Sequence, residues 1–253
     1  MCFDHDSRPP ITPIAGGALD AHEVALDAAD GSRFAAFVAR AAEPTGAGIV
    51  ILPDVRGLHA YYRELALRFA EHGVDAIAID YFGRTAGIGD RGPGFDWQPH
   101  VAQTTYDGLR ADVAGAAARL RADAGVERLY ATGFCMGGRL TFLAAGFGLD
   151  LAGVIGFYGW PVGPSRNGTP APADVAGSFT CPVLGIFGGA DEGIGSEAVA
   201  AFESALTAAG VPHRVTTYPD APHSFFDRKA ADFADASAQA WDEALGFIRS
   251  GAV

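Results

Sequence analysis

Positive charge is scarce in this sequence of 253 residues, in which 18 lysine and arginine residues face 30 aspartate and glutamate residues and the formal net charge is −12. Nucleic acid binding requires a clustered positive surface, so we exclude nucleic acid as a partner. The same negative field repels anionic substrates at long range. A site for an anionic small molecule would therefore need arginine residues placed next to it.

Cysteine, long apolar runs and metal-binding spacings are also rare or missing. Three scattered cysteine residues do not form a disulfide framework, and we expect Cys2 and Cys181 to be small buried hydrophobic residues. No apolar run approaches the roughly 20 residues that span a bilayer, and the acidic, proline-broken start over 1–10 is not a signal peptide. No C-x-x-C or H-x-x-x-H spacing occurs. We expect a cytoplasmic protein with no metal, no cofactor and no membrane contact.

The sequence does contain a cysteine flanked by glycines, in the segment G-F-C-M-G-G over 133–138. A short apolar run precedes this segment and an apolar, alanine-rich stretch follows it, which is the strand–turn–helix layout of a nucleophile elbow. Such a tight turn leaves no room for side chains at Gly133 and Gly137. It also places Cys135 at the start of a helix, where unpaired N–H groups and the helix dipole favour negative charge. The pattern predicts that Cys135 is a nucleophile.

An acid and a histidine follow Cys135 in the chain order that an α/β-hydrolase triad requires. A predicted buried strand runs into Asp191, and a later alternating strand delivers the loop that contains His223. All three residues would lie just past the C-terminal ends of strands, where open parallel sheets bind their ligands. We therefore predict Cys135 as nucleophile, His223 as base and Asp191 as the residue that orients the base, with Glu192 as the alternative acid.

Strand and helix patterns alternate along the chain, which predicts an α/β-hydrolase fold with a mostly parallel central sheet of about eight strands and helices on both faces. The strands are predicted over 24–26, 34–38, 48–52, 74–79, 129–132, 153–158, 182–187 and 213–218, and the helices over 58–72, 101–124, 140–145, 195–209 and 230–249. No composition shift marks a domain boundary. We expect one domain over 1–253, with an irregular N-terminal arm over 1–20.

Two loops and two backbone amides complete the predicted site. Residues 83–99 and 161–177 are rich in glycine and proline, and each loop follows a predicted strand. We expect both to form pocket walls, the alternative being loops that are merely solvated. In this fold one oxyanion donor is the N–H after the nucleophile, and the other lies in the loop after an early strand. We therefore assign the oxyanion hole to the backbone amides of Met136 and Val55.

Taken together, these motifs resemble the dienelactone hydrolase family of α/β-hydrolases over nearly the whole chain, from about Val24 onward. The motifs are LPDVRG over 52–57, DYFGR over 80–84, GFCMGG over 133–138, GFYG over 156–159, Asp191, and HSF over 223–225. The resemblance implies that the protein hydrolyses a small ester or lactone through a cysteinyl acyl-enzyme. Water is then the only second substrate.

The resemblance also implies a role for Asp54. In the best-studied branch of the family, a glutamate after the early strand keeps the resting thiol protonated until substrate displaces it. Asp54 occupies this position and is shorter by one methylene. Because a nearby carboxylate opposes formation of a thiolate, we hypothesise that Asp54 restrains Cys135 at rest. The alternative is that Asp54 only caps a turn.

Further residues are implied to bind the substrate. The family uses arginines to bind the dienelactone carboxylate, and Arg84 matches one of them in position. Arg228 stands one residue from the expected place of the second, with an acidic residue before it. Tyr158 and Trp160 are candidates for apolar pocket walls, although aromatic residues near strand ends are as often part of the core.

Three functions compete for this sequence. The prediction is a cysteine-dependent ester or lactone hydrolase, acting as a monomer or a small homo-oligomer. The alternative is a non-catalytic or ligand-scavenging binding protein on the same scaffold, because a fold alone does not confer activity. A thiol-based redox protein is the weakest candidate, since Cys135 has no resolving cysteine near it in sequence and Cys181 belongs to a different strand.

Overall fold

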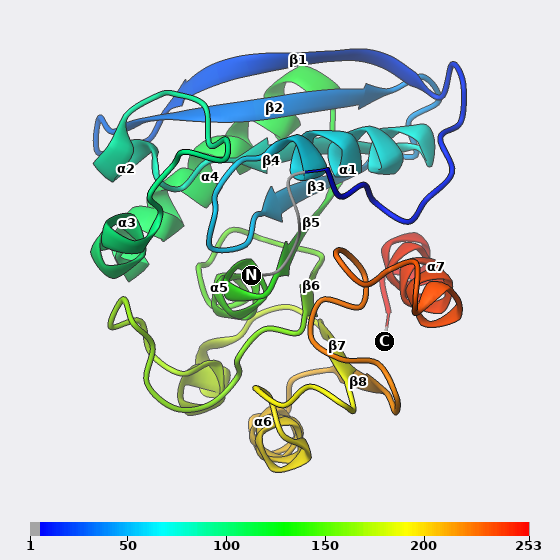
Figure 1. Cartoon of the computed structure of the whole chain (residues 1–253). Coiled ribbons are helices and arrows are strands. Elements are labelled where there is room, and N and C mark those ends of the chain that lie inside the picture. Colours follow the sequence, from blue (N-terminus) through cyan, green and yellow to red (C-terminus); the bar gives the residue numbers. More distant parts are fainter. Residues whose placement is uncertain (1–5, 253) are drawn as a thin grey trace.

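A central sheet organises the computed structural model, which describes residues 6–252 (Figure 1). In this part of the chain the sheet has eight strands in the order β1-β2-β4-β3-β5-β6-β7-β8. The strands are β1 (Ala18–Asp27), β2 (Arg33–Ala41), β3 (Ala47–Leu52), β4 (Val74–Ile79), β5 (Arg128–Phe134), β6 (Gly153–Phe157), β7 (Val183–Gly188) and β8 (His213–Tyr218). Strand β2 is antiparallel to both β1 and β4, and every other pair is parallel. The predicted eight-stranded, mostly parallel sheet is confirmed.

The composition of each strand follows from its place in the sheet. Every residue of β3, β4 and β7 is buried, as expected for parallel strands that are covered on both faces and read as continuous apolar runs. Asp75 in β4 is a charged residue within these apolar runs. Its Oδ1 accepts hydrogen bonds from the amide of Ala41 (2.9 Å) and from Nε of Arg40 (3.1 Å). By contrast, β1 lies at the edge of the sheet and is mostly exposed.

Helices cover both faces of the sheet. They are α1 (Ala60–Glu71), α2 (Gly83–Ala86), α3 (Gln98–Gln103), α4 (Tyr106–Ala124), α5 (Met136–Ala144), α6 (Ser196–Ala208) and α7 (Ala234–Ser250), with a 3₁₀ helix over Pro172–Ser178. Figure 1 shows α1 and α7 on one side of the sheet and α4 and α5 on the other. Helices α1 and α7 meet where the rings of Phe69 and Trp241 lie 4.7 Å apart, and α5 meets α6 where those of Phe142 and Phe202 lie 4.8 Å apart.

Several element boundaries differ from the predictions. The helix predicted over 101–124 is two helices, because Thr105 has an extended backbone and its hydroxyl accepts the N–H of Gly108 (3.1 Å) as the N-cap of α4. Both predicted loops contain helical turns, α2 in the first and the 3₁₀ helix in the second. Strand β1 begins inside the arm that was predicted to be irregular, and α7 begins four residues later than predicted.

The remaining sequence predictions concern cysteines and membranes. Cys181 is buried, and burial raises the pKa of its thiol to about 12, so it is the inert residue we expected. Cys2 lies outside the described residues. Within residues 6–252, no helix has both the length and the apolar character that crossing a membrane requires.

Candidate active site

The three predicted triad residues lie at one edge of the sheet, because each follows a strand of its parallel part. Cys135 comes directly after β5, Asp191 follows the end of β7, and His223 follows the end of β8. Parallel neighbours bring their carboxyl ends to the same edge, which is where open α/β sheets place their ligand sites. This catalytic edge, formed by the segments after β3 to β8, is the candidate site.

Cys135 sits in the strained turn that the sequence predicts. Its backbone has φ 56° and ψ −115°, a left-handed conformation that non-glycine residues rarely adopt. A Cβ atom on Gly133 would lie 2.3 Å from the carbonyl oxygen of Gly137, and one on Gly137 would lie 2.1 Å from that of Leu52. Real Cβ atoms never approach so closely, so only glycine allows β5, the turn and α5 to pack together. The turn lifts the partly exposed Cys135 to the start of α5.

Asp191 and His223 are joined by a short hydrogen bond, with 2.6 Å between Asp191 Oδ2 and His223 Nδ1. The side chain of Asp191 is 2% exposed and that of His223 is 30% exposed, so the acid is enclosed while the imidazole reaches the surface. Burial by itself raises the pKa of Asp191. The hydrogen bond and charge of His223 and the amides of Gly193 and Ile194 outweigh burial, so the pKa of Asp191 is lowered. An ionised Asp191 favours the imidazole tautomer with its proton on Nδ1.

Tyr158 connects the imidazole of His223 to the turn that carries Cys135. In the parallel pair β5–β6, Phe134 is opposite Phe157, so Cys135 and Tyr158 are neighbours at the ends of their strands. The ring of Tyr158 packs against the imidazole with 4.9 Å between their centroids. Among the described residues, no hydrogen bond joins Cys135 Sγ to His223 or to Asp54. Catalytic hydrogen bonds are often long before substrate binds, so this geometry is compatible with a triad.

The two amides assigned to the oxyanion hole donate no hydrogen bond within the described residues, unlike the amides that follow Val55. Met136 is the first residue of α5, so its N–H has no carbonyl of that helix to bond to. In the loop after β3, the amide of Arg56 donates to Asp54 Oδ1 (2.9 Å) and that of Gly57 donates to the carbonyl of Asp54 (3.1 Å). No described residue accepts the N–H of Val55. Both amides are thus available as donors at the catalytic edge.

Asp54 is fully buried and is part of this turn. Its Oδ1 accepts the amide of Arg56, which is the turn-capping contact that we considered as an alternative role. Its own amide donates to the hydroxyl of Tyr62 (3.0 Å), and its carbonyl accepts from the hydroxyl of Tyr81. Asp54 therefore helps to shape the loop that carries Val55, while a second role in restraining Cys135 stays a hypothesis.

Comparison with known proteins supplies the family. The model of the dienelactone hydrolase family matches residues 34–251. The chain belongs to the dienelactone hydrolase family. A protein of Salmonella typhimurium with the name "Putative carboxymethylenebutenolidase" is 32% identical, covering 97% of this chain and 96% of its own. A Bradyrhizobium protein named "Probable 2-oxo-3-(5-oxofuran-2-ylidene)propanoate lactonase" is 28% identical, covering 79% and 82%.

A solved structure agrees with the family assignment. The crystal structure of a "Putative Dienelactone Hydrolase" from Klebsiella pneumoniae subsp. pneumoniae MGH 78578 superposes with a TM-score of 0.79 at 27% identity, covering 91% of this chain and 99% of the other. The fold of this chain is therefore that of the α/β-hydrolases. As a member of the dienelactone hydrolase family, the protein is an ester hydrolase of the carboxymethylenebutenolidase type.

Arg84, the predicted substrate anchor, is engaged by other side chains of the protein. Its Nε and one terminal nitrogen bind the carboxylate of Asp112 in α4 (2.9–3.1 Å), and the other terminal nitrogen binds Asp30 (2.5 Å) and Ser32 (2.8 Å) in the β1–β2 turn. Asp112 is fully buried. Two carboxylates of the protein itself therefore bind the guanidinium, and a role for Arg84 in binding the substrate stays a prediction.

The other three candidates for substrate binding also separate in the structure. Tyr158 is fully buried, its hydroxyl donates to Asp227 Oδ2 (2.8 Å), and its ring packs against the imidazole of His223. Trp160 is 48% exposed, which suits a pocket wall. The side chain of Arg228 is exposed to solvent. Of these residues, Trp160 alone combines an apolar surface with a place beside the triad.

Sequence reasoning missed two charged residues at this edge. Asp227 is buried next to Tyr158 and accepts the amide of Arg228, and burial raises its pKa to about 8, assisted by the negative charge of Asp54. Asp227 stood in the sequence four residues after His223, but nothing there showed that it would be buried. Arg139, one turn after Cys135, is also buried. Their signal was their closeness to triad residues in the chain.

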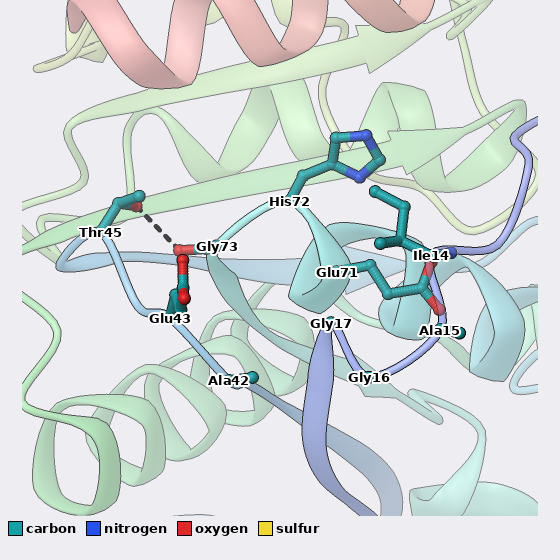
Figure 2. Close-up of a pocket in the computed structure, with 10 residues that line it drawn as sticks. All are labelled: Ile14, Ala15, Gly16, Gly17, Ala42, Glu43, Thr45, Glu71, His72 and Gly73. Carbon is teal, nitrogen blue, oxygen red and sulfur yellow. Dashed lines mark hydrogen bonds between the residues drawn. The ribbon is translucent and has the colours of Figure 1, made fainter.

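A large hollow lies elsewhere and is not the candidate site. The hollow has a volume of about 450 Å³. Figure 2 shows the residues that line it, which are Ile14, Ala15, Gly16, Gly17, Ala42, Glu43, Thr45, Glu71, His72 and Gly73. Thr45 and Gly73 precede β3 and β4, so the hollow is at the amino ends of the parallel strands. Glu71 is engaged there by Arg68 (2.8 Å) and by the amide of Ile14 (2.9 Å). Within residues 6–252, no group of three or more potential metal ligands is gathered.

Proposed function

We propose that this protein hydrolyses a small ester or lactone through a triad of Cys135, His223 and Asp191. The observation that carries the proposal is the 2.6 Å hydrogen bond from His223 to Asp191 beside a cysteine held at positive φ in a glycine-lined turn. A nucleophile at the start of a helix and a histidine oriented by a buried acid are the parts that acyl transfer needs. The name of the Bradyrhizobium relative, a probable lactonase, is consistent with this substrate class.

In the first half-reaction, His223 Nε2 accepts the thiol proton of Cys135, and Sγ attacks the carbonyl carbon of the substrate. The carbonyl oxygen becomes an oxyanion, which the amides of Met136 and Val55 stabilise. The tetrahedral intermediate collapses when the carbon–oxygen bond to the leaving group breaks, and His223 returns the proton to the leaving alkoxide. The product is a thioester on Cys135 and an alcohol, which in a lactone remains attached to the acyl chain.

In the second half-reaction, water takes the place of the alcohol. His223 Nε2 accepts a proton from water, whose oxygen attacks the thioester carbon, and the same two amides again hold the oxyanion. Breaking of the carbon–sulfur bond releases the carboxylic acid, and the proton returns from His223 to Sγ. Throughout both steps, the charge of Asp191 stabilises the imidazolium and fixes its orientation.

The experiment is hydrolysis of a small panel by wild type and by Cys135→Ala, followed by absorbance. The panel contains dienelactone, p-nitrophenyl acetate and butyrate, and a neutral lactone. Activity confined to wild type, together with a mass increase of one acyl group on Cys135 in a rapid quench, would support the proposal. Equal hydrolysis by both proteins would refute Cys135 as the nucleophile. A stable adduct on Cys135 without turnover would instead identify a scavenging binding protein.

A further inference from the structure

One buried cation, Arg139, is surrounded by main-chain carbonyls. Arg139 is 5% exposed and lies in the second turn of α5. One terminal nitrogen donates to the carbonyls of Trp160 (2.9 Å) and Val162 (3.4 Å). The other donates to the carbonyls of Gly163 (3.0 Å), Thr169 (3.3 Å) and Pro170 (3.0 Å). A single guanidinium thus binds both ends of one loop, residues 160–170, which we call the Trp160 loop.

Arg139 is paired with no carboxylate among the described residues. Burial lowers the pKa of Arg139, and the negative charge of Asp174 counteracts part of this effect from a distance. A buried cation without a carboxylate partner is costly unless its donors are satisfied. Here carbonyl oxygens accept from both terminal nitrogens of Arg139, whereas Nε is buried without a hydrogen-bond partner in the described part of the chain. The planar fork of arginine suits this purpose, because its donors point in several fixed directions at once, as those of lysine do not.

The Trp160 loop contacts both the helix that follows Cys135 and the loop that carries Asp191. At its base, the Cα of Gly159 packs so closely on α5 that a Cβ there would lie 2.3 Å from the amide nitrogen of Arg139. At its exposed side, the six-membered ring of Trp160 lies against Gly193, at 3.3 Å from the position a Cβ would take. The amide of Gly193 in turn donates to Asp191 Oδ1 (2.9 Å). Trp160 therefore spans from the helix of Cys135 to the loop of the acid.

We propose that Arg139 is a positioning residue that holds the Trp160 loop as a fixed wall of the substrate pocket and thereby limits the size of the acyl group or ring that reaches Cys135. The inference rests on the proposed function, since it treats the space between Trp160 and Cys135 as the acyl pocket. Loss of the clamp frees the loop at both ends, so Trp160 no longer excludes bulky groups. The small substrates lose orientation at the same time.

Proteolysis tests the clamp without any reference to catalysis. Arg166 is exposed at the tip of the Trp160 loop and is followed by Asn167, so trypsin has a cleavage site there. Trypsin cuts where the backbone opens locally, and we expect cleavage after Arg166 to be about tenfold faster in Arg139→Gln than in wild type. Arg121→Gln is the matched control, because Arg121 also donates to two carbonyls from a helix surface (2.7 and 3.1 Å) but is not attached to this loop.

Alkylation tests the wall and does not require turnover. The rates at which iodoacetamide and the bulkier N-phenylmaleimide label Cys135 are measured by peptide mass, and their ratio reports how well large groups reach the thiol. We expect the ratio to shift toward the bulky reagent about fivefold in Arg139→Gln and in Trp160→Ala, but not in Arg121→Gln. In the double variant the two shifts should not add, because Arg139 acts through Trp160.

Each outcome decides the inference. Unchanged cleavage after Arg166 would show that the loop is held without Arg139, and faster cleavage with an unchanged labelling ratio would show that the loop is no wall; either result overturns the proposal. If Arg139→Gln does not fold, Arg139→Lys replaces it, because lysine keeps the charge but reaches fewer carbonyls. A wild type that hydrolyses nothing in the panel would refute the proposed function while both tests of Arg139 still gave an answer.

Discussion

Replacement of Arg84 by alanine separates a structural arginine from a substrate anchor. The side chain of Arg84 is 17% exposed, and its guanidinium joins the fully buried Asp112 of α4 to the half-exposed Asp30 of the β1–β2 turn. All three nitrogens of the guanidinium already bind groups of the protein, so none is left to bind a substrate at the catalytic edge. We therefore expect Arg84→Ala to lower stability and to leave the discrimination between anionic and neutral substrates unchanged.

The size of the effect should depend on pH through Asp112. Burial raises the pKa of Asp112 to about 6, even though Arg84 opposes this shift. The pKa of Asp112 is thus higher in the folded protein than in the unfolded chain. The contribution of Asp112 to the free energy of unfolding, which is present at low pH, is therefore lost as pH rises through about 6. Without Arg84 the pKa of Asp112 rises further and the loss extends to higher pH. We expect Arg84→Ala to cost about 1–2 kcal/mol at pH 5, where hydrogen bonds are lost, and about 3 kcal/mol at pH 8, where a buried charge also loses its partner.

Urea unfolding at pH 5 and pH 8 measures both values. Asp30→Ala is the control for the exposed half of the network and should have a smaller effect, because solvent screens that pair. Asp112→Asn in the Arg84→Ala background should remove the dependence on pH, since no buried carboxyl then titrates at this position. The KM values for dienelactone and for a neutral lactone are measured with the same proteins.

Two results would refute this reasoning. A loss of stability below about 0.5 kcal/mol at both pH values would mean that the network contributes nothing measurable, as is common for exposed ion pairs. A selective increase in KM for the anionic substrate would mean that Arg84 leaves its partners to bind the carboxylate, as the family resemblance predicts.

Three further predictions concern the catalytic edge. Gly137→Ala should abolish folding or activity, because its Cβ would lie 2.1 Å from the carbonyl oxygen of Leu52; circular dichroism with activity measures this, and a folded, active variant would contradict it. Asp227→Asn should flatten the decline in unfolding free energy between about pH 4 and pH 8, because burial raises the pKa of Asp227 to about 8 and the unfolded chain ionises first; parallel urea curves for both proteins would refute this. Asp54→Ala should change the pH profile of Cys135 alkylation if Asp54 restrains the thiol, and an unchanged profile would leave only its turn-capping role.

The sequence was sufficient to predict the sheet and the placement of Cys135, Asp191 and His223 after its strands, because both depend on local signals. Apolar runs such as the one in β3 identify buried strands, and glycine at 133 and 137 is required by contacts within a single turn. Asp191 and His223 could be found in the same way, since strand ends define their positions. The hydrogen bond between them then follows from the parallel neighbours β7 and β8.

The roles of charged residues could not be predicted in this way. Arg84 stands where the family places a substrate arginine, but its partners are 28 and 54 residues away in the chain and meet it only in the folded protein. Asp227 appeared to be an intruder in the arginine motif, whereas folding buries it under Tyr158. Whether a charge is free to bind a ligand depends on long-range packing, which neither periodicity nor motif spacing records.

These placements change what kind of substrate the catalytic edge is suited to bind. Arg84 is occupied by two carboxylates, and Arg91 binds Asp80 at 2.7 Å while it covers the ring of Phe95. These two arginines already neutralise carboxylates of the protein itself, so they do little to offset the repulsion of an anionic substrate by the negatively charged chain. Around Cys135, Asp191 and His223, the proposed contacts to substrate come from Trp160 and from backbone amides. Selection by size and by the developing oxyanion, more than by substrate charge, is accordingly the discrimination that this arrangement favours, and comparison of dienelactone with a neutral lactone of equal size measures it directly.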